Sequence, residues 1–202
     1  EEAADYGSYE AFIEGLANAI DYTPDIVGYA INFSTQHDIF VRAEKIIKAK
    51  WPTSISVAGG THATNATREL FKLSSIDFVI RGESETSFAE FSACVHRRNT
   101  EAADSIGGVY SRNSVLMGEE NLEISEYPEL NELPLPAYHM FDVPRYSRID
   151  TTVTGDTNNR YAQGADGGIK QGSIMTSRGC PYHCTFCSSF SLHGRRMRYF
   201  SV

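Results

Sequence analysis

Short apolar runs that alternate with amphipathic helical patterns constrain the fold more than any other feature of the first 104 residues. Over residues 9–20 apolar side chains recur at helical spacing, and acidic or amide side chains occupy the opposite face. Short apolar runs follow at 25–31, 54–58 and 77–80, and each run precedes another helical pattern. Short buried strands that alternate with helices imply right-handed crossovers. The sequence therefore predicts an α/β fold with a doubly wound parallel sheet.

Local signals predict where the helices begin and end. Thr35 and Asp38 have the spacing of a capping box before one helical pattern, and Trp51–Pro52 ends that pattern. Asn65 is the expected cap of the next helix, and the helix after the third strand runs through Phe91. These signals place one helix after each predicted strand.

Small and polar residues follow the three predicted strands. The segments are Asn32–Thr35, Gly59–His62 and Arg81–Glu85. Ligands of doubly wound sheets bind outside the carboxyl ends of the strands, and glycine allows a ligand to approach the backbone closely. The alternative is that Gly59–Gly60 and Gly82 only make tight turns between a strand and a helix. Both interpretations remain open from the sequence.

The alternation stops after about residue 104. The runs 106–110 and 114–117 flank Arg112–Asn113 and predict a β-hairpin. Four prolines then punctuate a connector, and residues 151–169 have no apolar periodicity, which predicts a loop. We therefore expect three parts: an N-terminally incomplete domain over 1–104, a hairpin and proline-rich connector over 105–170, and a different unit over 171–202.

Composition excludes several classes of protein. The apolar fraction of 41% and the charged fraction of 22% are typical of globular proteins. The net charge of −8 argues against a nucleic-acid surface, and no apolar stretch approaches the ~18 residues of a membrane span. All 26 acidic residues lie at or before Asp166, whereas the last 32 residues carry four arginines and no acid. The cationic end is therefore expected to be a distinct unit.

Three of the four cysteines lie within eight residues, as Cys180, Cys184 and Cys187. They follow a strand predicted over 173–176 and have the spacing CxxxCxxC. Three thiolates on one loop are suited to ligate three irons of a 4Fe-4S cluster, which leaves the fourth iron open for chemistry. Unpaired cysteines also favour a reducing compartment, and the expected localisation is the cytoplasm.

Two other interpretations of the cysteine loop stay open: a zinc site, and three unrelated buried cysteines, which their close spacing beside Gly179 and Pro181 disfavours. Zinc requires four ligands, and His183 or His193 could supply the fourth. Structural zinc sites usually pair their ligands in two knuckles, whereas this chain has one compact group. The arginines near the cysteines could offset the charge of a cluster or simply form a solvated surface; they are Arg178, Arg195, Arg196 and Arg198.

The segment from Ser177 to Cys187, SRGCPYHCTFC, resembles the cluster loop of radical S-adenosylmethionine enzymes. The resemblance implies that Cys180, Cys184 and Cys187 ligate the 4Fe-4S cluster and that Phe186 lies beside the adenine of S-adenosylmethionine. In that family the open iron binds S-adenosylmethionine, and reductive cleavage yields a 5′-deoxyadenosyl radical. The last part of the chain would then be the first βα unit of a (β/α) barrel.

The preceding region resembles the cobalamin-binding domain of one subgroup of that family, which has a Rossmann-like fold. The resemblance rests on four phrases in order: PDIVG from Pro24, GGTHAT from Gly59, RGESE from Arg81 and LPLP from Leu133. It implies that Ser34, Thr35, Gly59 and Gly60 line the pocket for the nucleotide tail of cobalamin.

The same resemblance concerns two further residues. Glu83 would lie at the next strand end among the cofactor contacts. His62 lacks the DxHxxG context of histidines that ligate cobalt, so a polar contact or a role in shaping the loop is expected.

The family's first strand would lie before Glu1, and most of the ~250 residues of a barrel would follow Val202. We therefore expect the chain to be a piece of a longer protein.

Together these observations predict a cobalamin-dependent radical S-adenosylmethionine enzyme that transfers a methyl group to carbon. Its cofactors would be a 4Fe-4S cluster, S-adenosylmethionine and cobalamin. Its partners would be a small-molecule substrate and an electron donor such as flavodoxin or ferredoxin, with no nucleic acid and no membrane span. The alternatives are a radical methylthiotransferase and a non-catalytic cobalamin-binding module with a structural zinc site.

Overall fold

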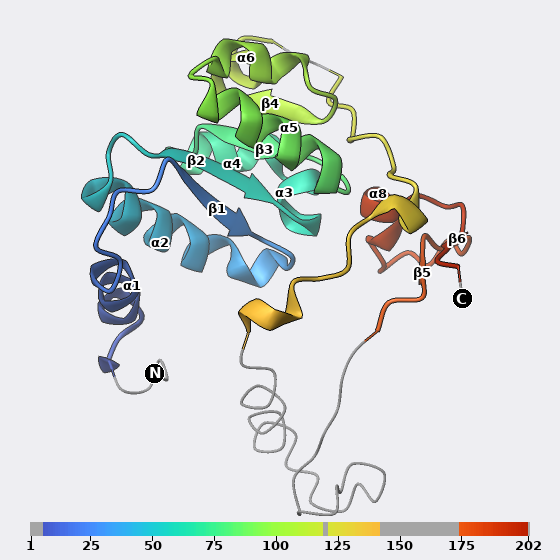
Figure 1. The fold of residues 1–202 in the computed structure, drawn as a ribbon, viewed down its shortest axis with the longest axis horizontal. Helices are drawn as coiled ribbons and strands as arrows, with labels where there is room; N and C mark the ends of the chain where they lie inside the picture. Colours follow the sequence, from blue (N-terminus) through green and yellow to red (C-terminus); the bar gives the residue numbers. More distant parts are fainter. Residues whose placement is uncertain (1–5, 119–120, 142–173, 202) are drawn as a thin grey trace, which may run out of the picture. The chain divides into compact units, whose positions relative to one another are not determined.

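A computed structural model describes residues 6–118, 121–141 and 174–201 of the chain. Figure 1 shows these segments coloured along the sequence. The chain divides into two compact units. The first contains Glu1–Glu129 with Gly179–Arg198, and the second contains Leu130–Arg178 with Tyr199–Val202. The predicted boundaries after residues 104 and 170 stay a prediction.

The first unit is built on a four-stranded sheet in the order β1-β2-β3-β4. The strands β1 (Ile26–Ala30), β2 (Ile55–Gly59) and β3 (Phe78–Ile80) are parallel, as the alternation predicts. The strand β4 (Val109–Ser111) is antiparallel to β3. The α/β fold is therefore confirmed, with a mixed and mostly parallel sheet.

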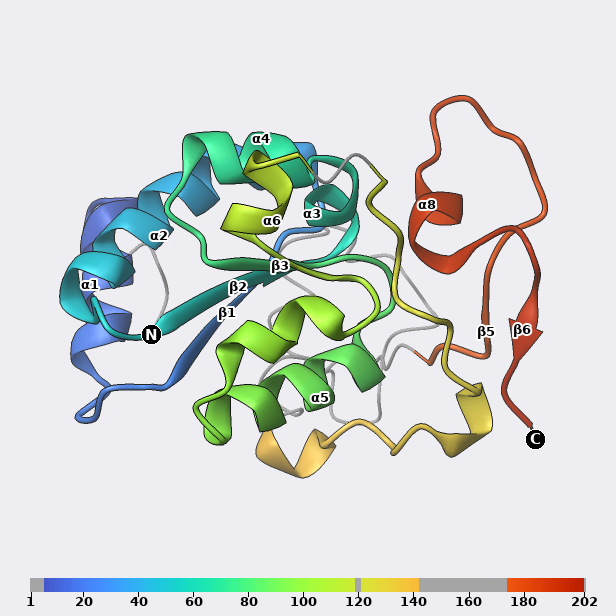
Figure 2. The same cartoon turned by 90° about the horizontal axis from the view of Figure 1, so that it is seen from above.

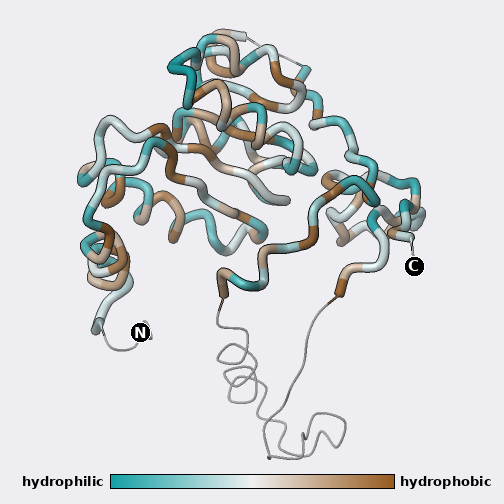
Figure 3. The backbone as a smooth tube through the Cα atoms, in the orientation of Figure 1, coloured by the Kyte–Doolittle hydropathy of each residue, from teal (hydrophilic) through white to brown (hydrophobic). Residues whose placement is uncertain are grey.

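Helices cover both faces of this sheet (Figure 2). One face packs against α2 (His37–Lys50), α3 (Thr61–Asn65), α4 (Thr67–Leu73) and α6 (Arg112–Leu116). The other face packs against α5 (Glu85–His96) and the 3-10 helix η3 (Thr100–Ser105). Consecutive residues of a strand point to opposite faces, so Ala58 belongs to the first core and Val57 to the second. The central strands contain many of the hydrophobic positions in Figure 3.

The first helix, α1 (Tyr9–Asn18), confirms the helical pattern predicted at the start of the chain. Ser8 caps it, because the Ser8 hydroxyl accepts a hydrogen bond from the Ala11 amide over 3.1 Å. An ion pair between Arg42 and Glu10 links α1 to α2 over 2.7 Å. The helix α2 ends at Lys50, as the following Trp51–Pro52 predicts.

Two predicted helix caps are wrong. Thr35 lies inside a short 3-10 helix, η2 (Ser34–Gln36), and the N-cap position of α2 is Gln36. The Gln36 side-chain oxygen instead accepts hydrogen bonds from the Asn32 and Phe33 amides, over 3.0 and 3.1 Å. Asn65 ends α3 and does not cap a helix, since α4 begins only at Thr67.

The predicted hairpin around Arg112–Asn113 is also wrong. The first predicted strand became β4 and pairs with β3, but the chain then enters α6. Ser111 caps this helix, since its hydroxyl accepts from the Ser114 amide over 3.2 Å. The Asp104 carboxylate fixes Ser111 by accepting from its amide over 2.6 Å and from its hydroxyl over 2.7 Å. This local capping outweighs the apolar character of 114–117.

The second unit contains the 3-10 helices η4 (Leu130–Glu132) and η5 (Tyr138–Met140). The strand predicted over 173–176 is displaced, because β5 is Ser177–Arg178 and it forms a two-stranded sheet with β6 (Arg198–Tyr199). The predicted loop over 151–169 lies outside the described residues. None of the helices in the described segments is long and apolar enough to cross a membrane.

Candidate functional site

A groove of about 360 Å³ lies on the face of the sheet that α5 covers only in part. Its floor is formed by β1 and β2, where Gly28 and Gly59 have no side chain. A Cβ atom at Gly28 would meet no atom within 4 Å, and one at Gly59 would meet only Ile80 O at 3.7 Å. The groove is therefore open because two glycines occupy its floor. Other residues that line it include Ala30, Val57, Gly60, Ser84 and Phe88.

Gly60 lies in the turn that follows β2, beside this groove. Its φ of +99° is a conformation that residues with a side chain rarely adopt. A Cβ there would lie 2.6 Å from Asn32 Oδ1 and 2.8 Å from Ile31 O, in the turn that follows β1. Gly60 thus brings the two neighbouring strand ends into close contact.

Gly82 has a different function in the fold. Its φ is +86°, and an added Cβ would lie 3.0 Å from Ile124 Cβ and 3.2 Å from Ser125 N. The Gly82 amide also donates to Thr64 Oγ1 over 3.1 Å. This glycine therefore permits a tight turn against residues 124–125. Of the two interpretations of Gly82, this supports the tight turn and not the close approach of a ligand.

A chain of hydrogen bonds joins the first two strand ends. His62 Nδ1 lies 3.2 Å from Ser34 Oγ, and His62 Nε2 lies 2.9 Å from His37 Nδ1. Burial lowers the pKa of His62, and the nearby His37 lowers it further, whereas Glu69 acts in the opposite direction. Ser34 and Thr35 are exposed. Sequence reasoning missed His37, although it lies only three residues after Ser34, at the start of α2.

Glu83 is the most deeply buried of the predicted cofactor contacts. Its side chain is 1% exposed, and its Oε1 lies 2.7 Å from His193 Nδ1. The same oxygen accepts a hydrogen bond and ion pair from the Arg198 guanidinium. The carboxylate at the third strand end is thus bonded to the segment that follows the cysteines, and its predicted contact with a cofactor stays a prediction.

The cysteine loop begins at Gly179, where the backbone conformation and the close approach of Arg196 require a glycine. Gly179 has a φ of +90°, and a Cβ there would lie 2.1 Å from Arg196 O. The Cys180 amide donates to Gly194 O over 3.2 Å, and Arg195 Nη1 donates to Tyr182 O over 3.0 Å. The loop is therefore held by the residues that follow the short helix α8 (Ser189–His193).

The three predicted ligands are unpaired thiols. Cys184 is exposed, and Cys180 and Cys187 are half-buried. Hydrogen bonding from Ser189 lowers the pKa of the Cys187 thiol because it stabilises the thiolate. Three thiols are a suitable donor set for an iron-sulfur cluster. Among the described residues, no three His, Cys, Asp or Glu side chains are arranged around a common metal position, so the assignment of these ligands stays a prediction.

The structure also places the other residues predicted near the cysteines. Phe186 is 90% exposed, which leaves its ring free for a ligand. Arg195 lies over the Phe190 ring at 4.2 Å, and Arg198 lies over the Tyr127 ring at 4.4 Å. His193, one of the histidines considered for zinc, is bonded to Glu83 through Nδ1.

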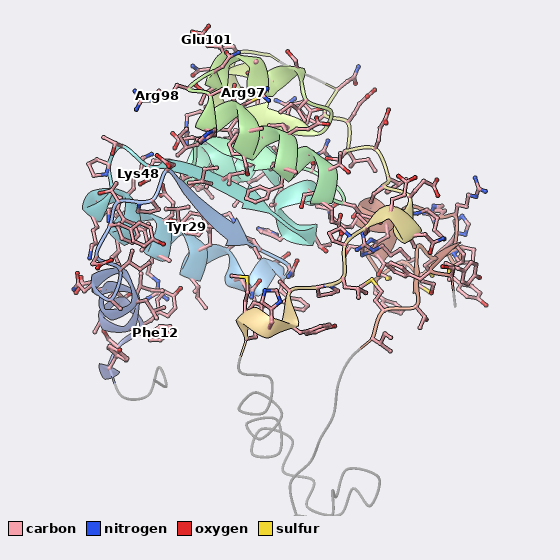
Figure 4. The ribbon with its side chains drawn as sticks, viewed as in Figure 1. Phe12, Tyr29, Lys48, Arg97, Arg98 and Glu101 are labelled. Carbon is pink, nitrogen blue, oxygen red and sulfur yellow. The ribbon has the colours of Figure 1, made fainter. Side chains whose placement is uncertain are left out.

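A second polar cluster lies at the opposite, amino edge of the sheet. Lys48, labelled in Figure 4, donates to Asp77 Oδ2 and to Ser54 O, each over 2.8 Å. Asp77 Oδ2 also accepts from the Ser56 amide and hydroxyl over 2.8 Å. Because these groups satisfy one another, we interpret the cluster as structural.

The family model of the B12 binding domain matches residues 9–92, a range that begins with α1 and extends into α5. The fold of this part of the chain is thus that of a B12-binding domain. Relatives extend the likeness to nearly the whole chain. An uncharacterized methyltransferase, PH0819, of Pyrococcus horikoshii is 31% identical over 94% of this chain and 39% of its own length.

Two further comparisons agree. The cobalamin-dependent radical SAM methyltransferase TokK of Streptomyces tokunonensis is 28% identical over 87% of this chain and 23% of its own length. The solved structure of the radical S-adenosylmethionine methyltransferase TsrM from Kitasatospora setae superposes with a TM-score of 0.58, at 15% identity, over 96% of this chain and 35% of that one. Residues 9–92 therefore belong to the B12 binding domain family, and the chain is similar over most of its length to methyltransferases that include radical S-adenosylmethionine enzymes. It spans less than two fifths of the length of these relatives.

Proposed function

We propose that this chain provides the cobalamin-binding domain and the cluster-bearing segment of a cobalamin-dependent radical S-adenosylmethionine methyltransferase. The observation that carries this proposal is that the glycine-floored groove and the cysteine loop belong to one compact unit. Relatives named as methyltransferases support it, among them cytidylyl-2-hydroxyethylphosphonate methyltransferase of Streptomyces wedmorensis, at 25% identity over 90% of this chain and 36% of its own length.

In this proposal the groove holds the nucleotide tail of cobalamin. Gly28 and Gly59 leave room for a ligand to lie directly on the strands, and Gly60 keeps the adjoining turn close to β1. Ser34 and Thr35 are exposed at the neighbouring strand end and would provide polar contacts. His62, held between Ser34 and His37, would present a neutral imidazole and shape the loop.

The cysteine loop would hold the second group of cofactors. Cys180, Cys184 and Cys187 would ligate the 4Fe-4S cluster, and the exposed Phe186 ring would lie beside the adenine of S-adenosylmethionine. When bound, the cluster supplies an electron for the cleavage of S-adenosylmethionine, and cobalamin supplies a methyl group for transfer to carbon. An electron donor such as flavodoxin or ferredoxin, a small-molecule substrate and a cytoplasmic setting belong to the same proposal.

The experiment is anaerobic reconstitution with iron, sulfide and hydroxocobalamin, followed by metal analysis and spectra with and without S-adenosylmethionine. We expect about four irons and one cobalamin per chain, and a cluster spectrum that S-adenosylmethionine perturbs. Cys184→Ala should abolish that perturbation, while the matched variant Cys94→Ala, on α5, should retain it. Stoichiometric zinc without stable iron would favour the cobalamin-binding module instead. Perturbation that survives in Cys184→Ala would refute the ligand assignment.

A further inference from the structure

We infer that Glu83 is a positioning residue, which fixes the cysteine loop against the carboxyl end of the sheet and so sets the separation of the two cofactors. This inference rests on the proposed function for the identity of those cofactors. The contacts that carry it lie within the first compact unit. They join the third strand end to residues more than 100 positions later in the chain.

The first step is the burial of the Glu83 carboxylate. Only 1% of the side chain is exposed, and His193 and Arg198 both bond to the same oxygen. A buried carboxylate is stable only when it is paired and hydrogen-bonded, so its two partners are held in place as firmly as the carboxylate itself. Glu83 therefore fixes both His193 and Arg198 at the end of β3.

The second step is the support around Arg198. Its guanidinium lies over the Tyr127 ring at 4.4 Å and donates to Pro128 O over 3.2 Å. Gly194 approaches the same tyrosine closely, since a Cβ at Gly194 would lie 2.8 Å from Tyr127 OH. The residues after α8 are thus packed on Tyr127 while Glu83 holds their charged ends.

The third step connects these residues to the cysteines. Gly194 directly follows His193, and its carbonyl accepts from the Cys180 amide over 3.2 Å. Arg195, the next residue, donates to Tyr182 O over 3.0 Å. Two hydrogen bonds therefore connect the end of β3 to the first predicted cluster ligand: one joins Glu83 to His193, and the other joins Gly194 to Cys180. Movement at Glu83 is therefore transmitted to the loop through His193 and Gly194. None of the hydrogen bonds described for the cysteines joins them directly to Glu83.

Hydrogen exchange of the full chain without cofactors tests this attachment. Glu83→Gln keeps the size of the side chain but removes its charge, and Glu90→Gln is the matched control because Glu90 is exposed on α5. In Glu83→Gln we expect the amides of Cys180 and Gly194 to exchange roughly tenfold faster, while the core strands stay protected. Glu83→Asp should restore part of the protection. Unchanged exchange in Glu83→Gln would overturn the inference.

A spectroscopic measurement tests the consequence for the cofactors. Cob(II)alamin and a reduced cluster are both paramagnetic, so their magnetic coupling depends on the distance between them. In Glu83→Gln we expect iron and cobalamin contents equal to those of Glu90→Gln but a coupling that is weaker or broadly distributed. Coupling identical in the two variants would overturn the inference. Absence of either cofactor in the unmodified chain would refute the proposed function, and hydrogen exchange would still decide the attachment.

If Glu83→Gln fails to fold, Arg198→Gln takes its place, because Glu83 then keeps its hydrogen bond with His193. Arg98→Gln is the matched control, since Arg98 lies at the amino edge of the sheet, beyond the end of α5. The same two measurements apply. Faster exchange at Cys180 and Gly194 in Arg198→Gln alone supports the inference, and equal exchange in both variants overturns it.

Discussion

The Asn65 side-chain amide donates a hydrogen bond to Ser191 Oγ over 2.8 Å, which joins residues 126 positions apart in the chain. Asn65 ends α3, directly after the second strand-end turn, and Ser191 lies in α8, directly after the cysteines. The same amide also donates to Thr61 O over 2.8 Å. Asn65, which the sequence predicted to be a helix cap, thus forms a second link between the sheet and the cysteine-bearing segment. The first link is the pairing of Glu83 with His193 and Arg198.

Removal of this link should have a modest effect on stability. For Asn65→Ala we expect the free energy of unfolding to fall by about 0.5–1.5 kcal/mol, the usual contribution of a hydrogen bond. Denaturant unfolding measures the change, and Asn113→Ala, an exposed asparagine on α6, is the control. A decrease of the same size in both variants would show that the contact with Ser191 contributes nothing.

His62 should titrate below its ordinary pKa of 6.5, because burial and the neighbouring His37 disfavour its charged form. When the folded pKa of a histidine is lowered, the unfolded chain binds the proton more readily. The stabilising contribution is therefore present above pH 6.5 and is lost as the pH falls below it. NMR titration reports the pKa, and His62→Gln should flatten this part of the pH–stability curve. The control is His96→Gln, exposed at the end of α5, and an equal flattening there would contradict the assignment.

Gly60→Ala should destabilise the fold even though it adds only one carbon atom. The backbone at Gly60 has a positive φ, and the new Cβ would clash with Asn32 and with the Ile31 carbonyl. We expect a loss of about 1–3 kcal/mol, measured by denaturant unfolding. Gly107→Ala is the control, because a Cβ at Gly107 meets nothing within 4 Å. Equal stability of the two variants would mean that the turn relaxes without cost.

Filling the groove should weaken cobalamin binding without unfolding the domain. In Gly28→Val the added atoms enter open space on the floor of the groove, where no atom lies within 4 Å of a Cβ. We expect the same melting temperature within about 2 °C and an affinity for hydroxocobalamin reduced at least roughly tenfold. Gly107→Val, away from the groove, should bind like the unmodified chain. Undiminished binding by Gly28→Val would place the cobalamin elsewhere.

The central strands and longer helices could be predicted because their apolar spacing records which side chains are buried. Phe91 and Val95, for example, recur at helical spacing and both enter the core. The helix α6 could not be predicted in this way. Its start depends on Ser111 and on Asp104, seven residues earlier, and this capping competes with an apolar stretch that also suits a strand.

The candidate site was predicted less completely than the fold. Glycines at strand ends and closely spaced cysteines are visible in the sequence, since each depends on a local pattern. The pairing of Glu83 with Arg198 and of His37 with His62 depends on segments that only the folded chain brings together. A single sequence contains no signal for such pairs. The part of the site that connects the sheet to the cysteine loop was therefore the part that sequence reasoning missed.

The exposure of Cys184 has a practical consequence for any study of this chain. An accessible thiol without a metal is open to oxidation by air, first to a sulfenic acid and then to disulfides between molecules. Protein handled aerobically would accumulate covalent dimers and lose the free thiols that the proposed cluster requires. Non-reducing gel electrophoresis of aerobic and anaerobic preparations would reveal this damage before any assay is begun.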